Sequence, residues 1–403
     1  MKVLQINAVC GVGSTGRICQ ELSDSLIEEG HESLILFGNG QSDYFHAKKI
    51  ASKIGVKIHG VLSRLTGKNA TFSPISTGKA IKEIKRFQPS IVHLHNLHGN
   101  YINLKRLLKY LSKNDIATVI TLHDCWFFTG KCTHYTSVRC YKWQKGCKKC
   151  PKLKADIPSW FFDRTPKMWK EKKQFFSAIP RLAVVGVSDW ITVEAQNCFL
   201  KDAKIIQRIY NWIDLSVFYP RTEDIRDKYG IPKDKFLVLC IGAGWTKGTA
   251  KYEDLLRLSS TLGDDTQIVL AGNIPEGENL PSNITAIGYV RSTEELAKLY
   301  SQADVYVHLS REDTFGKVIA EALACGTPAI VYNATACPEL IGEGCGYVVK
   351  TGNIEEVENC IDKVRELGKL QFSDKCTHFV KENFEKEQLI KATIELYDRL
   401  SKE

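Results

Sequence analysis

The sequence of 403 residues contains no uninterrupted run of apolar residues as long as the roughly 18 that a transmembrane helix needs. Its first stretch, MKVLQINAVCGVG, reaches glycine too early for the apolar core and small-residue cleavage site of a signal peptide. Both absences predict a cytoplasmic protein. In that compartment the 14 cysteines are expected to stay reduced, and most of them to be small core residues.

Acidic residues are fewer than basic ones, 46 against 55, which gives a formal net charge of +9. This excess suggests an anionic partner, which could be a nucleotide phosphate, a nucleic acid or a membrane surface. The sequence carries no recognised DNA- or RNA-reading motif, so nucleic acid is not the expected partner.

Short apolar stretches alternate with amphipathic ones, which predicts an α/β fold with parallel sheets. Strand-like segments such as KVLQINAV, ESLILFGNG and ATVITLHD form a first series, and the pattern restarts near Pro220 with FLVLCIGAG. We therefore expect two Rossmann-like domains facing each other across a cleft. Their expected bounds are 1–218, with a cysteine-rich insertion at 130–155, and 219–385, followed by a helix at 386–403 that returns to the first domain.

The first glycine loop, GVGSTG, has the form of a dinucleotide-binding fingerprint at Gly11, Gly13 and Gly16. The fingerprint also requires an acid at the end of the second strand, where this chain has Leu-Phe-Gly-Asn at 36–39, so NAD is not expected. A glycine loop at a helix N-terminus still suits a phosphate or a sugar. A tight turn without a ligand remains the alternative.

Two histidine segments follow predicted strands. His123 and Asp124 come directly after a buried strand, where an α/β sheet opens toward its ligand. His93 and His95 lie on one face of another strand, and we interpret both first as hydrogen-bonded core histidines.

The stretch REDTFGKVIAEALACGTP predicts a helix that begins near Gly316 and ends at Gly326. Glu312 and Asp313 precede this helix, and Glu321 lies about one turn inside it. Backbone N–H groups near its start would face a ligand at the positive end of the helix dipole. The alternative is a capping acid followed by a solvated glutamate.

The stretch EDTFGKVIAEALACGTPAIVYNATACPELI resembles the nucleotide-sugar signature of retaining family 4 glycosyltransferases of GT-B fold. Further matches occur in order over nearly the whole chain: GSTGRI, VHLHNLHG, TLHDCWFFTGKC, NWIDLSVFYP and LYSQADVYVHLS. The version HLHN followed by TLHDCWFFTG is similar to enzymes that assemble colanic-acid-like or capsular polysaccharide.

The resemblance assigns roles to the acids by their spacing. Seven residues separate Asp313 from Glu321, as in the family motif, so Asp313 takes the place of a glutamate that binds donor sugar hydroxyls. Glu321 is then expected to hold the nucleotide ribose, and Glu312 to matter less. Aspartate reaches one methylene less far than glutamate, so the donor contact is expected to differ.

The family also has an arginine and a lysine that hold the donor diphosphate. The corresponding segment, IGAGWTKGTAKYEDLL, contains no arginine. Lys247 is the expected phosphate ligand, and Lys251 is its competitor if the loop carries an insertion. A cation here would stabilise the negative charge of the departing diphosphate.

The resemblance implies a catalytic set of His123, Asp313, Glu321 and Lys247. It places donor contacts at Gly13, Ser14, Asn211, Lys247, Lys251, Thr314, Phe315, Gly316, Lys317 and Glu321, and it places His95 and Asp124 on the acceptor side.

The implied reaction is transfer of a sugar, with retention of anomeric configuration, from a UDP- or GDP-linked donor to a surface polysaccharide or lipid-linked glycan. No catalytic cofactor is expected, because no Asp-x-Asp pair of the metal-bridging kind is present. A GT-B nucleotide-sugar epimerase is the first alternative. A zinc-containing nucleic-acid-binding protein is an alternative of another class.

Four cysteines, Cys132, Cys140, Cys147 and Cys150, fall in a stretch of nineteen residues that comes after the His-Asp pair. Four thiols suit a structural zinc site, and the Cys-x-x-Cys pair at 147–150 has a spacing that zinc sites favour. Reduced core cysteines and two disulfides remain the alternatives. The basic stretches KAIKEIKRF and RTPKMWKEKKQFF suggest contact with the inner face of the cell membrane, with a solvated basic helix as the alternative.

Overall fold

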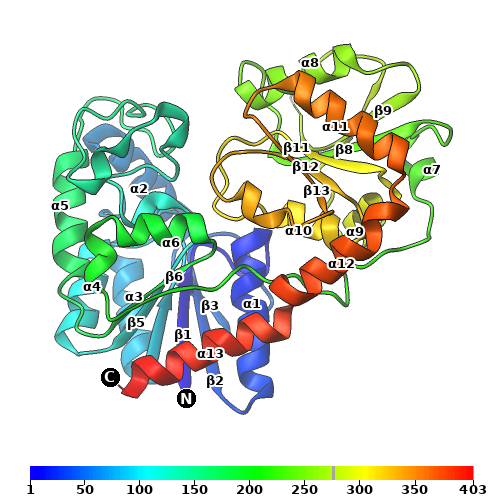
Figure 1. Cartoon of the computed structure of the whole chain (residues 1–403). Coiled ribbons are helices and arrows are strands. Elements are labelled where there is room, and N and C mark those ends of the chain that lie inside the picture. The colour runs from blue at the N-terminus through cyan, green and yellow to red at the C-terminus, as the bar shows by residue number, and fades with distance from the viewer. Residues whose placement is uncertain (275–276, 403) are drawn as a thin grey trace. The chain divides into compact units, whose positions relative to one another are not determined.

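The computed structural model describes residues 1–274 and 277–402, and it divides the chain into two compact units (Figure 1). Unit 1 comprises Met1–Tyr210 and Leu389–Glu403, and unit 2 comprises Asn211–Gln388. Residues 275–276 of the expected second domain and residue 403 of the expected C-terminal segment lie outside the described residues.

Unit 1 contains a seven-stranded sheet with the order β3-β2-β1-β4-β5-β6-β7, and every pairing in it is parallel. Its strands are β1 (Lys2–Asn7), β2 (Glu32–Phe37), β3 (Ala47–Lys49), β4 (Ile91–Leu94), β5 (Ala117–Leu122), β6 (Leu182–Gly186) and β7 (Ile205–Arg208). Its helices are α1 (Gly13–Glu28), α2 (Lys53–Thr66), α3 (Pro74–Phe87), α4 (Leu104–Lys113), α5 (Thr165–Phe176), α6 (Asp189–Gln196) and most of α13 (Lys386–Lys402).

Unit 2 contains a six-stranded parallel sheet with the order β10-β9-β8-β11-β12-β13. Its strands are β8 (Phe236–Gly244), β9 (Thr266–Asn273), β10 (Ile284–Gly288), β11 (Val305–His308), β12 (Ala329–Tyr332) and β13 (Gly346–Val349). Its helices are α7 (Arg226–Tyr229), α8 (Ala250–Thr261), α9 (Thr293–Gln302), α10 (Lys317–Ala324), α11 (Ile354–Leu367) and α12 (Leu370–Phe384).

The pattern of apolar residues explains why the strands are buried in the sheets and why the helices cover them. Every residue of β5, ATVITL, is buried, as expected for a parallel strand covered on both faces. In α4, Leu104, Leu107, Leu108 and Leu111 recur at helical spacing and are buried, while lysines occupy the exposed side. Burial of each leucine contributes about 1.5 to 3 kcal/mol before the entropy cost of ordering it.

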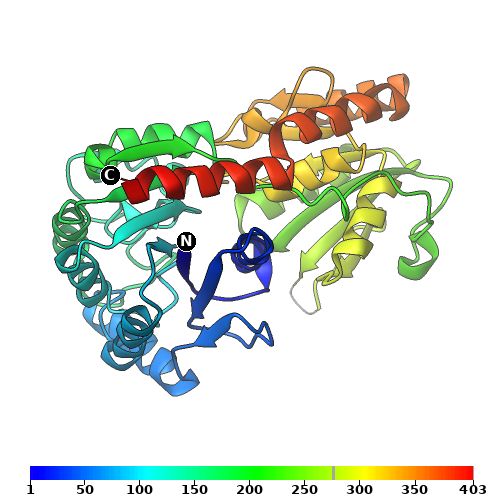
Figure 2. The same cartoon turned by 90° about the horizontal axis from the view of Figure 1, so that it is seen from below.

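The C-terminal helix α13 belongs to unit 1 from Leu389 onward, as the sequence predicts, and Figures 1 and 2 show it running across that unit's strands. The buried hydroxyl of Tyr397 on α13 lies 2.6 Å from Nδ1 of His93 on β4. Arg399 of the same helix contacts Gln207 on β7. The last helix therefore completes the core of unit 1.

Each sheet reverses its strand order at one point, between β1 and β4 in unit 1 and between β8 and β11 in unit 2. Open α/β sheets bind ligands at the carboxyl ends of the strands that flank such a switch point. The loops that follow these four strands are therefore where the site residues should gather. None of the helices in the described ranges combines the length and apolar character needed to cross a bilayer.

Candidate functional site

The switch point of unit 1 is lined by histidines. His95 follows β4 and His123 follows β5, and Nδ1 of His95 lies 3.0 Å from Nε2 of His123. The other ring nitrogen of His95 lies 3.1 Å from the amide oxygen of Gln5 on β1. Burial lowers the pKa of His123 to about 4, although the charge of Asp124 opposes the shift. His123 is therefore neutral at pH 7 and can both donate and accept a hydrogen bond.

His93 lies one layer deeper and has a structural role. It is buried, and Nε2 lies 2.7 Å from the hydroxyl of Thr121 while Nδ1 contacts Tyr397. Burial lowers its pKa to about 3. The prediction of hydrogen-bonded core histidines at 93 and 95 is confirmed.

Asp124 pairs with a histidine that the sequence analysis did not assign. Nε2 of His98 lies 2.8 Å from Asp124 Oδ2, and the Trp126 N–H donates to Oδ1 over 2.8 Å. Burial alone would raise the pKa of Asp124, but these partners hold it below its ordinary value. The only sequence signal for His98 is that it is the third histidine of VHLHNLHG.

The glycine loop of unit 1 ends at the N-terminus of α1. Gly11 and Gly13 have φ values of 72° and 64°, which residues other than glycine rarely adopt. Gly13 and Ser14 begin α1 and are exposed, and Val12 before them supplies no side-chain cap. The first amides of α1 are therefore available to a ligand.

In unit 2 the corresponding feature is the N-terminus of α10. The helix begins at Lys317 with Gly316 as its cap, which confirms the predicted start. Gly316 has a φ of 83°, which favours glycine, and a Cβ there would lie 2.8 Å from Cδ1 of Ile319, which would have to shift. Thr314 and Phe315 are buried, and Lys317 is half-buried at the helix start.

Asp313 lies in the loop after β11 and contacts a histidine at the end of that strand. Its Oδ2 lies 2.8 Å from Nε2 of His308, whose Nδ1 is 3.0 Å from the Tyr306 hydroxyl. The Asp313 N–H donates to the hydroxyl of Thr335 over 2.9 Å. His308 therefore orients the Asp313 carboxylate, a role that sequence spacing did not reveal.

Glu321 lies in the second turn of α10 and is buried, with 4% of its surface exposed. The hydroxyl of Tyr300 donates to its Oε2 over 3.2 Å. Burial and the neighbouring Glu321 raise the pKa of Tyr300 well above its ordinary value. The alternative of a solvated helix glutamate is wrong for Glu321.

The two candidate lysines occupy different environments. The side chain of Lys247 is 76% exposed, and its Nζ lies 3.5 Å from Glu278. The Nζ of Lys251 donates to the Gly244 carbonyl over 2.9 Å and lies 4.2 Å from the centre of the Trp245 ring. Burial lowers the pKa of Lys251, and the charge of Asp313 counteracts that shift. Lys251 therefore belongs to the group around Asp313.

Two further residues of the sequence analysis, Asn211 and Glu312, also lie in unit 2. Asn211 is buried at the first position of unit 2, next to a segment in which the Ile213 N–H donates to Phe384. Glu312 is half-buried beside Ser310.

Within the described ranges, one group of side chains lies close enough together to bind a metal ion. It consists of His308, Asp313 and Cys337, whose ligand atoms lie within 4.8 Å of one another. Burial raises the pKa of Cys337 well above its ordinary value, and its thiol is therefore protonated. We interpret these residues as the support of Asp313 rather than as a metal centre.

The basic stretches do not present their aromatic residues as expected for membrane contact. In α5, which contains RTPKMWKEKKQFF, Trp169, Phe175 and Phe176 are buried. These aromatic residues pack into unit 1, so they do not face a membrane, and a membrane contact of this stretch would involve its exposed lysines alone. The helical period places the aromatics on the inner face.

Comparison with known proteins identifies two family models that together span most of the chain. Residues 15–217 match "Glycosyltransferase Family 4", and residues 221–385 match "Glycosyl transferases group 1". WcaC of Escherichia coli (strain K12), named for glycosyl transfer in colanic acid biosynthesis, is 24% identical over 372 residues, which cover 89% of this chain and 88% of WcaC.

Solved structures share the fold. Sucrose-phosphate synthase from Thermosynechococcus elongatus superposes with a TM-score of 0.70 at 16% identity, covering 99% of this chain and 98% of the synthase. Anabaena HepE, solved in complex with UDP-glucose, gives a TM-score of 0.67 at 15% identity, with 99% and 100% covered.

Proposed function

The chain belongs to the family 4 glycosyltransferases, and we propose that it transfers a sugar from a nucleoside-diphosphate donor, UDP- or GDP-linked, to a surface polysaccharide or lipid-linked glycan. The polysaccharide is suggested by the similarity to WcaC, and a UDP-linked donor by the similarity to HepE. The retaining course of the reaction is part of the same proposal.

The observation that carries this proposal is the grouping of charged residues at the switch point of unit 2. Asp313, after β11, is oriented by His308, and Lys251 approaches from α8 at the end of β8. The N-terminus of α10 adds backbone N–H groups at Phe315 and Gly316. Acceptors for sugar hydroxyls thus lie beside donors for a diphosphate.

Each residue has a defined role in this proposal. Asp313 accepts hydrogen bonds from hydroxyls of the transferred sugar, and Glu321 accepts them from the nucleotide ribose. Thr314 and Lys317 flank the helix start that receives the phosphates. Lys251, rather than the exposed Lys247, neutralises the diphosphate, since a partly desolvated ammonium interacts more strongly with an anion than a hydrated one does.

The reaction breaks the bond between the anomeric carbon and the diphosphate oxygen and forms one to the acceptor oxygen on the same face. The leaving phosphate takes the proton of the acceptor hydroxyl, so no separate protein base is needed. Lys251 and the α10 amides stabilise the charge that develops on the leaving group. No catalytic metal takes part in this scheme.

Unit 1 is the proposed acceptor side. The half-buried His123 and His98 and the ionised Asp124 are the groups proposed to meet sugar hydroxyls, while His95, whose ring nitrogens contact His123 and Gln5, orients His123. The exposed amides at Gly13 and Ser14 add a place for an anionic group.

The test is a panel of UDP- and GDP-linked sugars, assayed for transfer and hydrolysis by mass spectrometry and for anomeric configuration by NMR. Release of nucleoside diphosphate with one donor class supports the proposal. Conversion of the donor into its epimer without release of the nucleotide would replace it with the epimerase alternative. Lack of both binding and turnover across the panel would contradict it.

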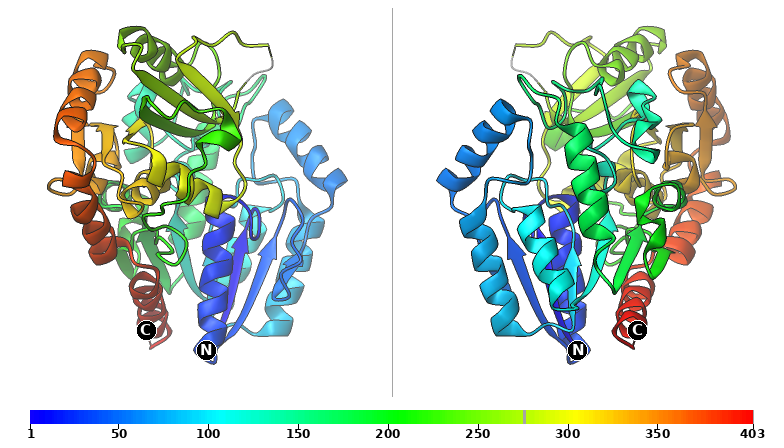
Figure 3. Two further views of the ribbon diagram at one scale, coloured as in Figure 1. Left: turned by 90° about the vertical axis from the view of Figure 1, so that its right-hand side faces the viewer. Right: turned by 90° about the vertical axis from the view of Figure 1, so that its left-hand side faces the viewer.

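A membrane-linked acceptor would require the protein to work at a membrane surface, and we propose that α2 provides the contact. Ile54, Ile58, Val61 and Leu65 form one exposed stripe on this helix, with exposures of 71%, 54%, 48% and 37%. The helix contains lysines and an arginine but no acid. Figure 3 shows α2 at the outer edge of unit 1.

An aromatic loop extends this stripe. Trp160, Phe161 and Phe162 are 49%, 66% and 50% exposed, and the Trp160 N–H donates to the Arg64 carbonyl over 2.8 Å. We call the seven apolar residues of the helix and the loop the α2 surface. Exposed apolar and aromatic residues ringed by basic ones are typical of proteins that bind an anionic bilayer.

Vesicle sedimentation tests this contact independently of catalysis. Binding to vesicles containing phosphatidylglycerol should fall at least tenfold in Ile58→Asp, while Ile75→Asp, at a position that is 78% exposed on α3, should bind normally. Equal loss in both variants, or no binding by the wild-type protein, would contradict the role of the α2 surface.

A further inference from the structure

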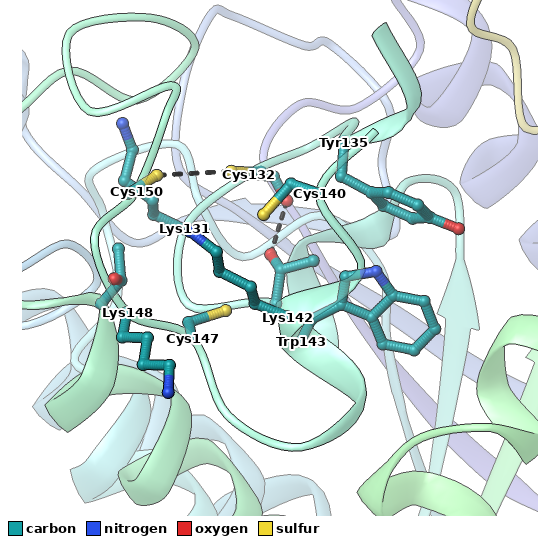
Figure 4. Close-up of a pocket in the computed structure, with 11 residues that line it drawn as sticks. Lys131, Cys132, Tyr135, Cys140, Lys142, Trp143, Cys147, Lys148 and Cys150 are labelled. Carbon is teal, nitrogen blue, oxygen red and sulfur yellow. Dashed lines mark hydrogen bonds between the residues drawn. The ribbon is translucent and has the colours of Figure 1, made fainter. Parts of the chain in front are cut away.

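The four half-exposed cysteines of unit 1 surround one small cavity, while the other cysteines of the chain are buried. Figure 4 shows the sulfurs of Cys132, Cys140, Cys147 and Cys150 around this space. The cavity has a volume of about 20 Å³. That is room for one water-sized particle and no more.

One pair of the sulfurs has the spacing of a tetrahedral zinc site. Cys132 Sγ and Cys150 Sγ lie 4.0 Å apart, and zinc bonds of about 2.3 Å place sulfurs about 3.8 Å apart. No three of the four sulfurs lie within 4.8 Å of one another in the described ranges. Metal binding therefore requires side-chain rotations that bring both Cys140 and Cys147 to the Cys132–Cys150 pair, in a segment without long helices or strands.

Two buried lysines lie beside the cluster. Lys131 and Lys172 are 3% and 1% exposed. Lys131 donates to the carbonyls of Lys152, Leu153 and Ala155, and Lys172 donates to those of Trp126 and Thr129. The negative groups that act on these amines are the sulfurs of the cluster, together with the carboxylates of Asp156 and Asp163 for Lys131 and of Asp124 for Lys172. Buried cations require a counter-charge, and zinc bound to four thiolates carries two negative charges.

Backbone N–H groups also point at the sulfurs. The Gly130 N–H donates to Cys147 Sγ over 3.1 Å, and the Lys152 N–H contacts the sulfur of Cys150. Such N–H donors stabilise thiolates and orient them as ligands.

We propose that Cys132, Cys140, Cys147 and Cys150 bind one structural zinc ion through four thiolates. Four protein ligands leave no open position for catalysis. The ion orders residues 129–163, whose only regular elements are two short 3-10 helices at Thr136–Val138 and Tyr141–Gln144. This segment has little apolar surface of its own, and the free energy of metal binding becomes free energy of local folding.

The ordered segment would also support its neighbours. It begins five residues after Asp124, and Lys172 connects it to Trp126, whose N–H holds the Asp124 carboxylate. It ends at the aromatic loop of the α2 surface. Loss of zinc is therefore expected to loosen both regions and leave the core of unit 2 unchanged.

The test uses the full chain purified without chelator or affinity metal. Elemental analysis should find about one zinc per chain, and cobalt exchanged into the site should give the absorption of tetrahedral cobalt-thiolate. Cys147→Ser combined with Cys150→Ser should reduce the zinc content at least tenfold. Cys360→Ser, at a buried cysteine on α11 in unit 2, should retain it.

Titration of the wild-type protein with a mercurial reagent covers the case in which the double variant does not fold. Zinc should then leave as four thiols react, and protease cleavage should appear between residues 129 and 163. Metal-free wild-type protein with full activity would overturn the proposal. A protein mass lower by four hydrogens, which indicates two disulfides, would also overturn the proposal. The same holds for a double variant that keeps its zinc.

Discussion

The two sheets reverse their strand order in the same way, but the residues at their switch points differ in charge. In unit 1, buried histidines lie there and burial keeps them neutral. In unit 2, a carboxylate, a lysine and a helix N-terminus lie there. Both sites contain a carboxylate and a helix N-terminus, so the difference is that neutral histidines accompany them in unit 1 and a lysine accompanies them in unit 2. This difference matches the division into acceptor side and donor side that we propose.

The largest effect is expected from the acids of unit 2. Asp313→Ala and Glu321→Ala should each lower kcat/KM by about 10- to 150-fold, since a charge-assisted hydrogen bond contributes about 1.5 to 3 kcal/mol. Steady-state kinetics measures this, with circular dichroism as the check on folding. Glu312→Ala is the matched control and should change the rate far less. If Glu312→Ala is the most damaging of the three, the assignment of the acids is wrong.

The next effect concerns stability in unit 1. The pKa of His93 is lowered from 6.5 in the unfolded chain to about 3 in the folded one. Neutral His93 therefore contributes fully to the free energy of unfolding above pH 6.5, and this contribution is lost as the pH falls toward 3. At pH 5 the loss is about 2 kcal/mol. His93→Gln, which does not titrate, should lose that much less stability between pH 7 and pH 5, measured by urea unfolding.

His378→Gln serves as the control for this comparison, because His378 is 72% exposed on α12 in unit 2. Its pH dependence should equal that of the wild-type protein. If His93→Gln and the wild-type protein lose stability equally, burial does not hold His93 neutral.

A smaller effect is expected from the phosphate ligand. Lys251→Met should weaken binding of a nucleoside diphosphate about tenfold, about 1.4 kcal/mol, and leave nucleoside binding unchanged. Calorimetric titration of both ligands measures this. Lys247→Met should show little selectivity because its side chain is exposed. Selectivity in Lys247→Met alone would return the role to Lys247.

The smallest effect is expected on the acceptor side. Asp124→Asn keeps the shape of the side chain but removes the charge opposite His98. It should raise the KM for the acceptor about fivefold, as expected for about 1 kcal/mol, and leave the KM for the donor unchanged. An equal rise for both substrates would mean that the pair supports the fold rather than the acceptor.

The sequence was sufficient for the parallel sheets, because buried strands such as β5 are continuous apolar segments. The sequence also predicted the start of α10 correctly, because Gly316 comes just before the apolar residues that recur at helical spacing. Local pattern decides both features.

Other features depend on contacts between distant segments. His98 and His308 gained roles only when their partners Asp124 and Asp313 were placed beside them. The choice between Lys247 and Lys251 depends on the path of the loop after β8. The burial of the α5 aromatics depends on which helix face packs inward, and a stretch rich in lysine conceals that face.

The path of α13 has a consequence for biosynthesis. Residues 1–210 leave the ribosome long before Tyr397, whose hydroxyl is a buried partner of His93. Until α13 has been synthesised, the nascent first domain lacks a helix of its own core and exposes that face of its sheet. Unit 2 is contiguous in the chain, so it can complete its fold first, and a nonsense mutation that removes only the last helix would damage the domain made earliest.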